Sequence, residues 1–384
     1  MSIGLGIAGL GTAGRALLRP VADRDDVRLV AVADPVAEAR SEVATRFGAR
    51  AHATLAELVA DPAVDAVYVA TPTDLHADHV LALAAAGKHV LVEKPMAIRL
   101  EQAERMIEAA ARSGVVLMVG QSHSYDMPYA AIRELVTGGT LGRVRMMHSI
   151  SYTDWVYRPR RPEELDAALG GGVTFRQGAH QFDVLRLIGG GLVRTVRAKT
   201  FDWDATRPVI GAHAAFLTFE DGTVATAVYN GYGAFLSAEM CFDIGAFGNP
   251  LPAVSAGKSR RAYRERGPGD ESAAKRTRVA SHTEAAPPNQ PFFGWLIVSC
   301  EGGDIRQSPD GLYVYTERGR EEITLPLRGT RDIMLAEFVD SIAGRRTPLH
   351  DGRWGMANLE VCVAAIESAR TDRDVALTRQ VPVP

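Results

Sequence analysis

The chain has 384 residues, 46% of them hydrophobic, which is enough for two domains with a core each. The formal net charge is only −3, with 43 basic and 46 acidic residues interspersed along the chain. This balance excludes a global attraction to nucleic acid or to an anionic membrane.

Cysteine usage and the N-terminal residues favour a cytoplasmic protein. Cys241, Cys300 and Cys362 are far apart and form no C-x-x-C pair, so neither a disulfide framework nor a metal site is expected. The N-terminal residues lack the basic region and cleavage site of a signal peptide, and no apolar run approaches about 18 residues. We therefore expect no membrane partner.

Residues 1–122 alternate short apolar, β-branched runs with longer helical patterns. This alternation predicts a parallel sheet with helices on both faces, as in doubly wound α/β domains. The runs that we expect to form its strands lie at residues 3–11, 27–34, 64–72, 89–95 and 115–121.

The pattern changes after residue 122, where alternating β-branched and aromatic residues are interrupted by Asp-Gly turns. Residues 123–384 therefore predict an α+β domain whose large sheet is mainly antiparallel and has helices on one face. The helical patterns assigned to this domain lie at residues 129–139, 180–190, 334–344 and 357–369.

Residues 251–291 carry Pro, Gly, Ser and charge with little apolar periodicity, so we expect a flexible loop there. The arginine cluster Arg260, Arg261, Arg264 and Arg266 in this segment could bind an anion. A solvated surface loop is the simpler interpretation.

A glycine-rich turn follows the first strand run. Its G-x-G-x-x-G spacing lets a tight turn bring the backbone close to a pyrophosphate at the start of a helix. We therefore expect residues 1–122 to form a dinucleotide-binding Rossmann domain. The predicted cofactor-binding residues of the turn are Gly9, Gly11, Thr12, Ala13 and Gly14.

Asp34 ends the second strand run. A carboxylate at this position accepts hydrogen bonds from the adenosine ribose hydroxyls and repels the 2′-phosphate of NADP. We therefore predict that the cofactor is NAD rather than NADP. The alternative is that Asp34 only caps the turn before Pro35.

Two later loops follow strands at the edge of the sheet where ligands of doubly wound domains bind. Thr71, Pro72 and Thr73 leave one strand and His76 begins the next helix, so we predict cofactor contacts for all four. Thr73 and Asp74 could equally serve as helix caps.

Glu93, Lys94 and Pro95 end the following strand, and we assign Glu93 and Lys94 to the cofactor site as well. An ammonium group there could also hydrogen-bond a substrate oxygen and stabilise negative charge on it. Position alone does not distinguish such a lysine from an exposed surface residue.

Taken together, G-x-G-x-x-G, T-P-x-x-x-H, E-K-P and a later G-G-G followed by G-x-H-x-x-D resemble the Gfo/Idh/MocA oxidoreductase family over nearly the whole chain. The resemblance implies a Rossmann domain, a second domain whose open sheet often forms the oligomer interface, and dehydrogenase activity. It also implies that Lys94 is the catalytic lysine and His180 the acid/base histidine. We accordingly expect a homodimer or homotetramer.

The chemistry of His180 agrees with this implied role. Oxidation of a secondary alcohol needs a group that takes the hydroxyl proton while hydride leaves carbon for the nicotinamide, and histidine titrates in the right range. Asp183 is expected on the same helical face, together with Arg176, and could orient the ring. The alternative is a core histidine in an amphipathic helix.

Arg176 departs from the family pattern. Many members have D-x-G-x-H, whereas this chain has Arg176 at the first position of that motif. A guanidinium suits a carboxylate better than a neutral sugar. Aromatic and basic residues near residue 155 add flat apolar surface and further cations. The predicted substrate-binding residues are His123, Tyr125, Trp155, Arg158, Arg176 and Asp183.

These departures predict an acidic, flat, cyclic substrate. Segments 121–129 and 298–315 resemble a subgroup that oxidises the cis-4,5-dihydrodiol of phthalate to the dihydroxy-aromatic acid during aromatic degradation. The expected carboxylate ligands are Arg176 and one or more of Arg158, Arg160, Arg161 and Arg306. Each of these except Arg176 could equally be an exposed surface charge.

Other functions stay open at this point. A sugar acid, an inositol or the hemiacetal of a carboxymuconate semialdehyde would be alternative substrates for the same chemistry. A nicotinamide-binding regulator without turnover is a further alternative, because a fold alone does not prove activity. Such a regulator would need to keep neither Lys94 nor His180, and this chain has both.

Overall fold

The computed structural model of the protein describes residues 2–267, 269, 271–280 and 287–384. The chain forms two compact units, one made of residues 1–122 and 330–359, the other of residues 123–329 and 360–384. No helix in the described part of the chain is long and apolar enough to cross a bilayer.

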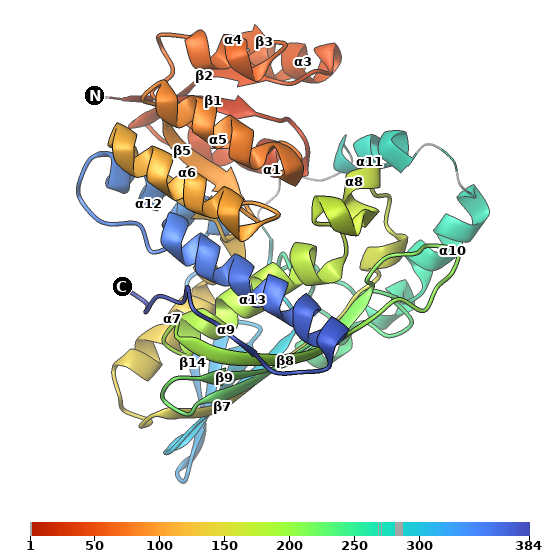
Figure 1. Ribbon diagram of the computed structural model, residues 1–384. Coiled ribbons are helices and arrows are strands. Elements are labelled where there is room, and N and C mark those ends of the chain that lie inside the picture. The colour runs from red at the N-terminus through yellow and green to blue at the C-terminus, as the bar shows by residue number, and fades with distance from the viewer. Residues whose placement is uncertain (1, 268, 270, 281–286) are drawn as a thin grey trace. The chain divides into compact units, whose positions relative to one another are not determined.

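The first unit is built on a six-stranded parallel sheet with the order β3-β2-β1-β4-β5-β6 (Figure 1). Its central strands are β-branched and buried on both faces, because helices pack on either side of a parallel sheet. The strands are β1 (Ile3–Ala8), β2 (Val27–Ala33), β3 (Arg50–His52), β4 (Ala66–Val69), β5 (His89–Glu93) and β6 (Leu117–Gly120).

All five predicted strand runs form strands of this sheet, which confirms the doubly wound domain. The sixth strand, β3, was not predicted because it has only three residues and two of them are exposed. It pairs with the edge of β2.

Helices connect these strands in chain order. The 3-10 turn η1 (Thr73–Leu75) precedes one of them, and η2 (Ser122–Tyr125) follows β6. The helices are α1 (Thr12–Ala16), α2 (Leu18–Ala22), α3 (Ala37–Phe47), α4 (Leu55–Ala60), α5 (His76–Ala85) and α6 (Leu100–Ser113).

Residues 330–359 belong to the first unit, which corrects their assignment to the second domain. They contain α12 (Thr330–Ile342) and the start of α13 (Gly352–Thr371). The His350 carbonyl accepts a hydrogen bond from the Val119 amide of β6 at 2.8 Å, and α12 packs on α2. Backbone pairing with a distant strand cannot be read from a helical pattern.

The second unit contains a nine-stranded sheet with the order β14-β13-β12-β11-β7-β10-β9-β8-β15. Neighbouring strands are antiparallel except β7 and β10, so the prediction of a mainly antiparallel sheet is confirmed. The strands are β7 (Val144–Tyr152), β8 (Val193–Phe201), β9 (Ala212–Phe219), β10 (Val224–Asn230), β11 (Trp295–Cys300), β12 (Gly303–Ser308), β13 (Gly311–Thr316), β14 (Gly319–Thr324) and β15 (Val375–Ala376).

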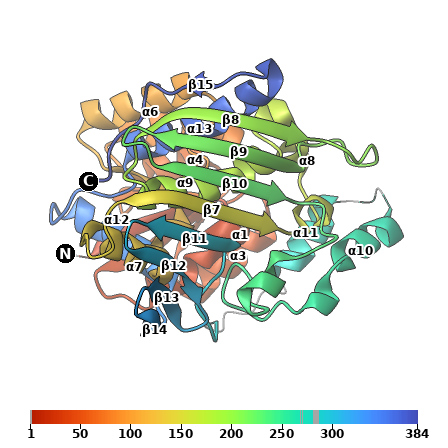
Figure 2. The same cartoon turned by 90° about the horizontal axis from the view of Figure 1, so that it is seen from below.

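One face of this sheet is covered by α7 (Met127–Thr137), α9 (Ala179–Ile188) and the end of α13, where the Ser368 hydroxyl accepts a hydrogen bond from the Ala198 amide of β8. Figure 2 looks onto the other face, with these helices behind the strands. No described helix covers that other face along β8, β9 and β10, whereas Cys241 and Ile244 pack on Trp295 of β11 there.

The prediction of a loop for residues 251–291 is wrong for the part that the structure describes. That part contains η7 (Ala253–Ser255), α10 (Lys258–Arg266) and α11 (Glu271–Ala280). The Glu271 carboxylate accepts hydrogen bonds from the Arg160 amide and the Arg207 guanidinium, both at 2.8 Å, and Lys275 pairs with Glu164. Ion pairs therefore help to hold α11 in place, and hydrophobic periodicity does not record such pairs.

The remaining short elements of the second unit connect β7 to β8 and β10 to β11. They are η3 (Trp155–Tyr157), α8 (Pro162–Leu165), η4 (Ala167–Leu169), η5 (Thr174–Gly178) and η6 (Ser237–Cys241).

Candidate functional site

The glycine-rich turn between β1 and α1 has the geometry that a dinucleotide requires. Gly9 has φ of +90°, in the left-handed region that favours glycine. A Cβ on Gly14 would lie 1.9 Å from the Gly9 carbonyl oxygen, so only glycine allows this close packing of helix on strand. Nothing lies within 4 Å of a Cβ built on Gly11, which leaves the backbone open to a phosphate. Thr12 and Ala13 form the first turn of α1.

Asp34 follows β2 and shapes this turn as well. Its carboxylate accepts hydrogen bonds from the Leu10 amide at 2.7 Å and from the Val36 amide at 2.9 Å. The carboxylate is therefore oriented beside the glycine turn and keeps further lone pairs for ribose hydroxyls. The residues present fit NAD.

His76 was predicted to contact the cofactor, but its ring contacts two main-chain carbonyl groups. Its ring is buried, with Nδ1 3.0 Å from the Pro95 carbonyl oxygen and Nε2 3.0 Å from the Thr71 carbonyl oxygen. The ring thus connects the loop after β4 with the loop after β5 and supports these loops rather than facing a ligand. Pro72 lies at the start of η1 and Thr73 is buried within it.

Glu93 also supports a loop. Its buried carboxylate accepts hydrogen bonds from the Tyr68 hydroxyl and from the Arg331 guanidinium at 2.7 Å. Burial alone would raise the pKa of Glu93, but Arg331 and Lys94 hold that pKa below its ordinary value. The next residue, Lys94, is half-buried, and its amide donates to the Glu93 carboxylate at 3.2 Å.

Arg331 was missed by the sequence analysis because it lies far from Glu93 along the chain, in α12. The Asp34, Thr71 and Lys94 loops follow β2, β4 and β5, which flank or follow β1 in the sheet order. The cofactor candidates therefore meet at one edge of this unit, as the motif spacing predicted.

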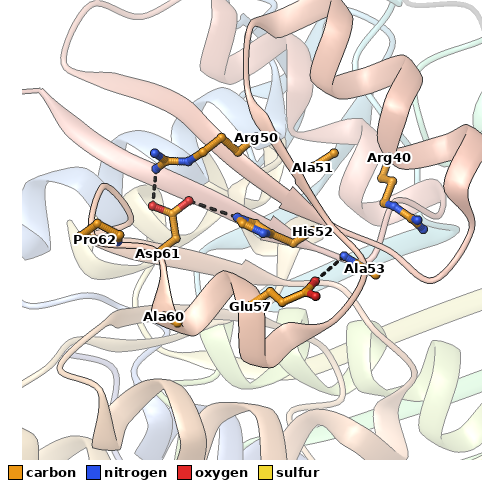
Figure 3. Close-up of a pocket in the computed structure, with 9 residues that line it drawn as sticks. All are labelled: Arg40, Arg50, Ala51, His52, Ala53, Glu57, Ala60, Asp61 and Pro62. Carbon is orange, nitrogen blue, oxygen red and sulfur yellow. Dashed lines mark hydrogen bonds and ion pairs between the residues drawn. The ribbon is translucent and has the colours of Figure 1, made fainter.

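A separate open depression of about 680 Å³ lies on the same unit, between α3, β3 and α4 (Figure 3). Arg50 and His52 both reach the Asp61 carboxylate, with His52 Nε2 3.1 Å from Asp61 Oδ2. The Glu57 carboxylate accepts from the Ala53 amide at 2.7 Å. These polar groups bind one another and the backbone. The side chains that line the depression therefore form a structural cluster.

In the second unit, α9 carries His180 and is anchored to the sheet by the adjacent Gln181. The Gln181 amide donates to Ser149 Oγ at 3.1 Å and to the Val228 carbonyl at 3.1 Å, and its oxygen lies 3.1 Å from His213 Nε2. Burial lowers the pKa of His213 to about 3, so His213 stays neutral and is a structural histidine.

Arg176 does not lie on the regular helix that carries His180. It belongs to η5, a π-helical turn of residues 174–178 that runs directly into α9. The expectation of one continuous helical face for Arg176, His180 and Asp183 is therefore wrong, because a π turn changes the angle between successive side chains. The Arg176 guanidinium donates to the Glu163 carbonyl at 3.4 Å.

His180 lies in a cluster of aromatic rings. Its ring centroid is 4.6 Å from that of His123, with the two planes at 79°, and 5.0 Å from that of Phe293. Phe247 lies 5.8 Å from His123 and is 67% exposed, whereas His180 is only 6% exposed. The cluster therefore joins a buried imidazole pair to an exposed flat ring.

His123 was predicted from the sequence as a substrate-binding residue, whereas Phe247 and Phe293 were not predicted. The Phe293 carbonyl accepts a hydrogen bond from the Ser151 hydroxyl of β7 at 2.7 Å, which fixes its loop. Neither phenylalanine belongs to a motif, so no local signal could have identified it.

Asp183 is buried one turn after His180 and accepts a hydrogen bond from the Ser124 hydroxyl. The neighbouring Tyr125 is buried as well. The segment 122–126 thus meets α9 through Ser124 and Asp183 as well as through the two histidines.

The predicted arginines of the 155–161 segment have structural partners. Arg158 pairs with Asp154, Arg161 with Glu163 at 2.7 Å, and Arg160 with Glu164 at 3.3 Å. These carboxylates neutralise the guanidinium groups, so the segment is not a set of cations directed at a ligand.

Trp155 is a core residue, contrary to its predicted contact with substrate. It is 1% exposed, and the Arg160 guanidinium lies 4.1 Å from its ring centroid. The indole face that was expected to receive a flat ligand is therefore occupied by Arg160.

Arg306 lies on the face of the sheet opposite α9. Arg306 pairs with Ile297 and Ile297 with His148, so these three side chains share one face. Ser149, the next residue in β7, points to the other face and contacts Gln181 of α9. Arg306 cannot contribute to a site around His180.

Family models match both parts of the chain. The family model described as "Oxidoreductase family, NAD-binding Rossmann fold" matches residues 3–121, and the model of the GFO/IDH/MocA C-terminal domain matches residues 129–239. Among the described residues, no group of three or more His, Cys, Asp or Glu side chains could hold a metal ion.

Two curated relatives illustrate the range of similarity. The chain is 37% identical over 384 residues to the 1-carboxy-3-chloro-3,4-dihydroxycyclohexa-1,5-diene dehydrogenase of Comamonas testosteroni, covering 96% of this chain and 95% of the relative. It is 33% identical over 196 residues to the myo-inositol 2-dehydrogenase of Thermotoga maritima, covering 50% of this chain and 57% of the relative.

Solved structures agree with the fold. A structure from Bordetella bronchiseptica RB50 is 39% identical, covers 98% of this chain and 100% of its own, and superimposes with a TM-score of 0.92. A levoglucosan dehydrogenase in complex with NADH and levoglucosan is 18% identical, with 98% of this chain and 99% of the other covered. It has a TM-score of 0.75 and shares the fold alone.

Three observations agree on the family. They are the matched family models, the glycine turn with Asp34, and the dehydrogenase relative that matches over the whole length. The protein is an NAD-binding oxidoreductase and belongs to the Gfo/Idh/MocA family.

Proposed function

We propose that this protein is a dehydrogenase that oxidises a ring-carboxylated cis-dihydrodiol to the corresponding dihydroxy-aromatic acid. The observation that carries the proposal is the cluster in which the buried His180 and His123 adjoin Phe293 and the exposed Phe247. A flat, partly unsaturated ring could stack on such a wall while its hydroxyl group reaches an imidazole. The name of the whole-length relative describes a carboxylated dihydroxycyclohexadiene, which supports the same substrate class.

His180 and Lys94 are the proposed catalytic residues. NAD, when bound, accepts the hydride that leaves the secondary alcohol carbon with the electron pair of its C–H bond. His180 takes the hydroxyl proton as the C–O bond becomes a carbonyl group. The Lys94 ammonium donates a hydrogen bond to the oxygen that bears the developing negative charge. Loss of the proton on the neighbouring diol carbon to the carbonyl oxygen then gives the aromatic ring.

The cofactor contacts proposed for this chain are those of the glycine turn, with Asp34 accepting hydrogen bonds from the adenosine ribose. Thr71 and Pro72 lie in the loop that follows β4, at the same edge, and we propose that they border the cofactor. His76 and Glu93 act indirectly in this proposal, by holding the Thr71 and Lys94 loops.

Arg176 is the proposed ligand of the substrate carboxylate. The position of Arg176 supports this role, because the residue lies on the π turn that leads directly into the helix of His180. Asp183 is proposed to orient His180 from one turn away.

Within this substrate class we propose a phthalate-type 4,5-dihydrodiol. The compound in the relative's name bears one carboxyl group, whereas a phthalate dihydrodiol bears two, so the second carboxylate is the distinguishing feature. Dihydrodiols with one and with two carboxylates separate these alternatives directly.

The deciding experiment follows reduction of NAD and of NADP by absorbance with a panel of substrates. The panel contains carboxylated and uncarboxylated cis-dihydrodiols, inositols, neutral sugars and sugar acids. We expect the highest kcat/KM with NAD and a carboxylated dihydrodiol. Preference for a neutral sugar or an inositol would contradict the proposal.

Arg176→Ala is the matched variant for this panel. It should raise KM by roughly 10- to 100-fold for carboxylated dihydrodiols, because a charge-assisted hydrogen bond to a carboxylate contributes about 1.5–3 kcal/mol. Uncarboxylated dihydrodiols should be almost unaffected. An equal loss for both classes would mean that Arg176 only supports the fold of the π turn.

We further propose that the chain assembles as a homo-oligomer through the uncovered face of the nine-stranded sheet. Side chains on that face are largely apolar and lie in register across the strands, which is typical of a face that pairs with a second copy. They include Met146, Ile150, Phe216, Val228, Trp295 and Ile297. Sedimentation of the purified protein should give a dimer or tetramer, and Phe216→Glu should yield monomer; a monomeric parent would contradict the proposal.

A further inference from the structure

His123 and Asp126 form a closed, buried unit beside His180. The distance from His123 Nδ1 to Asp126 Oδ2 is 2.7 Å, and the Asp126 amide donates to the His123 carbonyl at 3.0 Å. Only 4% of His123 is exposed. The turn between the two residues is thus fixed by side-chain and main-chain hydrogen bonds at once.

The position of Asp126 explains why its carboxylate can serve His123. Asp126 is the N-cap residue of α7, where a carboxylate usually accepts a hydrogen bond from the amide two or three residues on. Here the side chain makes no such bond. Pro128 has no N–H to donate, and the Tyr129 amide donates to the main-chain carbonyl of Asp126 instead. The carboxylate is therefore directed at the imidazole rather than at the helix.

This arrangement fixes the protonation and the electronic character of His123. Because a carboxylate accepts at Nδ1, that nitrogen carries the proton. The negative charge of Asp126 also makes the imidazole electron-rich. A negative charge close to a second imidazole favours positive charge on that second ring.

Phe293 holds the two imidazoles in this orientation. Its ring centroid lies 4.3 Å from that of His123 and 5.0 Å from that of His180. Electrostatic interactions are stronger in such an apolar environment than in water. Other titratable groups close to the pair are Tyr129 of α7, whose pKa is raised well above its ordinary value by burial, and Asp183 of α9.

We propose that His123, oriented by Asp126, is a positioning residue for His180. It fixes the plane of the His180 ring and favours the imidazolium that forms when His180 takes the substrate proton. This inference rests on the proposed acid/base role of His180.

Asp126→Asn tests the inference because the amide oxygen can still accept the Nδ1 proton while the charge is lost. The measurement is the pH titration of histidine ring signals by NMR in selectively labelled protein, with the His180 signal identified by its loss in His180→Ala. Removing a nearby negative charge disfavours the imidazolium, so the His180 midpoint should fall by about one pH unit. A midpoint equal to that of the parent protein would overturn the inference.

Activity gives a second readout. A histidine that acts as a base must be neutral, so the acidic limb of the kcat/KM profile reports its titration. In Asp126→Asn this limb should move to lower pH, with kcat reduced several-fold because the base is weaker. A loss of activity without movement of the limb would indicate a structural role and would overturn the inference.

Two further variants keep the test decisive. His123→Phe combined with Asp126→Asn preserves the aromatic packing and leaves no buried charge unpaired, so it should fold and show a shift in the same direction. Asp61→Asn makes the same chemical change in the His52–Asp61 pair of the first unit and should leave the His180 midpoint unchanged. If His180→Ala retains turnover, the proposed function fails; if only the His180 midpoint stays fixed, this inference alone fails.

Discussion

The two units reach their chemistry by different routes. In the first unit the candidate groups follow consecutive strands of a parallel sheet, and much of the geometry is main chain, as in the glycine turn and the amides that orient Asp34. In the second unit the histidine cluster draws side chains from four separate places in the chain, at residues 123–126, at residues 180–183, at Phe247 and at Phe293. A short motif can specify the first arrangement but not the second.

Buried charge is also used differently. Glu93 in the first unit has one strong partner, Arg331, and together they support the loop of Lys94. In the second unit, Glu164 accepts from both Arg160 and Lys275, which lowers the pKa of Glu164 to about 2 despite its burial. The first pair supports the loop that carries Lys94, and the second network fastens α11 to the rest of its unit.

The largest effect is expected for the two residues that we propose as catalytic, Lys94 in the first unit and His180 in the second. His180→Ala and Lys94→Ala should each lower kcat by about 10²- to 10⁴-fold, since general acid–base and electrostatic contributions are of that size. The affinity for NADH, measured by fluorescence, should stay unchanged in His180→Ala because the cofactor residues lie in the other unit. His52→Asn, a histidine of the structural cluster in Figure 3, is the control with parental kcat. Turnover near the parental level in either alanine variant would remove that residue from the mechanism.

The Glu93–Arg331 pair should dominate the stability of the first unit. Arg331→Met leaves a buried carboxylate without its cation and should lower the free energy of unfolding by about 3–5 kcal/mol. Glu93→Gln combined with Arg331→Met should recover much of that loss, because no charge is then left unpaired. Urea denaturation at neutral pH measures all three proteins.

The same pair predicts a pH dependence. The pKa of Glu93 is lower in the folded protein than its ordinary value of 4.5. The stability that it contributes is therefore complete above that value and is lost as the pH falls through the folded pKa. In Arg331→Met the buried carboxylate loses this cation, so its folded pKa should rise above 4.5 and the variant should instead gain stability as the pH falls from neutral toward 4.5. Parallel pH profiles for the two proteins would contradict this account.

The features that local geometry determines could be predicted from the sequence. G-x-G-x-x-G before a helix and an acidic residue after the second strand have one structural explanation, and the turn matches it down to the left-handed Gly9. The alternation of strand and helix patterns likewise identified the parallel sheet. Strand β3 was not predicted, because a three-residue exposed edge strand has no periodicity to detect.

The remaining features depend on contacts between distant residues. Nothing near Glu93 in the sequence points to Arg331, and nothing near His180 points to Phe293. The roles of the arginines in the 155–161 segment stayed open for the same reason, because the sequence does not show their carboxylate partners. The helix α11 makes ion pairs with the rest of its unit, which a hydrophobic pattern does not record.

The smallest effect is expected for Phe247. Its substitution is also the sharpest test of the aromatic cluster in the second unit. This ring is largely exposed, so Phe247→Ala should leave the fold and the free energy of unfolding almost unchanged. It should raise KM for cyclic dihydrodiols by roughly 3- to 10-fold without changing kcat, because an aromatic stacking contact contributes about 0.5–1.5 kcal/mol.

Phe242→Ala is the matched control for this last prediction. Phe242 is also partly exposed and lies five residues earlier, but its ring packs with Phe292 and Tyr313, and Arg306 lies over it on the face of the sheet away from α9. Steady-state kinetics with the best carboxylated dihydrodiol should therefore distinguish the two variants. An unchanged KM in Phe247→Ala, or an equal rise in both, would mean that the exposed ring beside His123 does not stack on substrate, and the flat-ring part of the proposal would then rest on the relative's substrate alone.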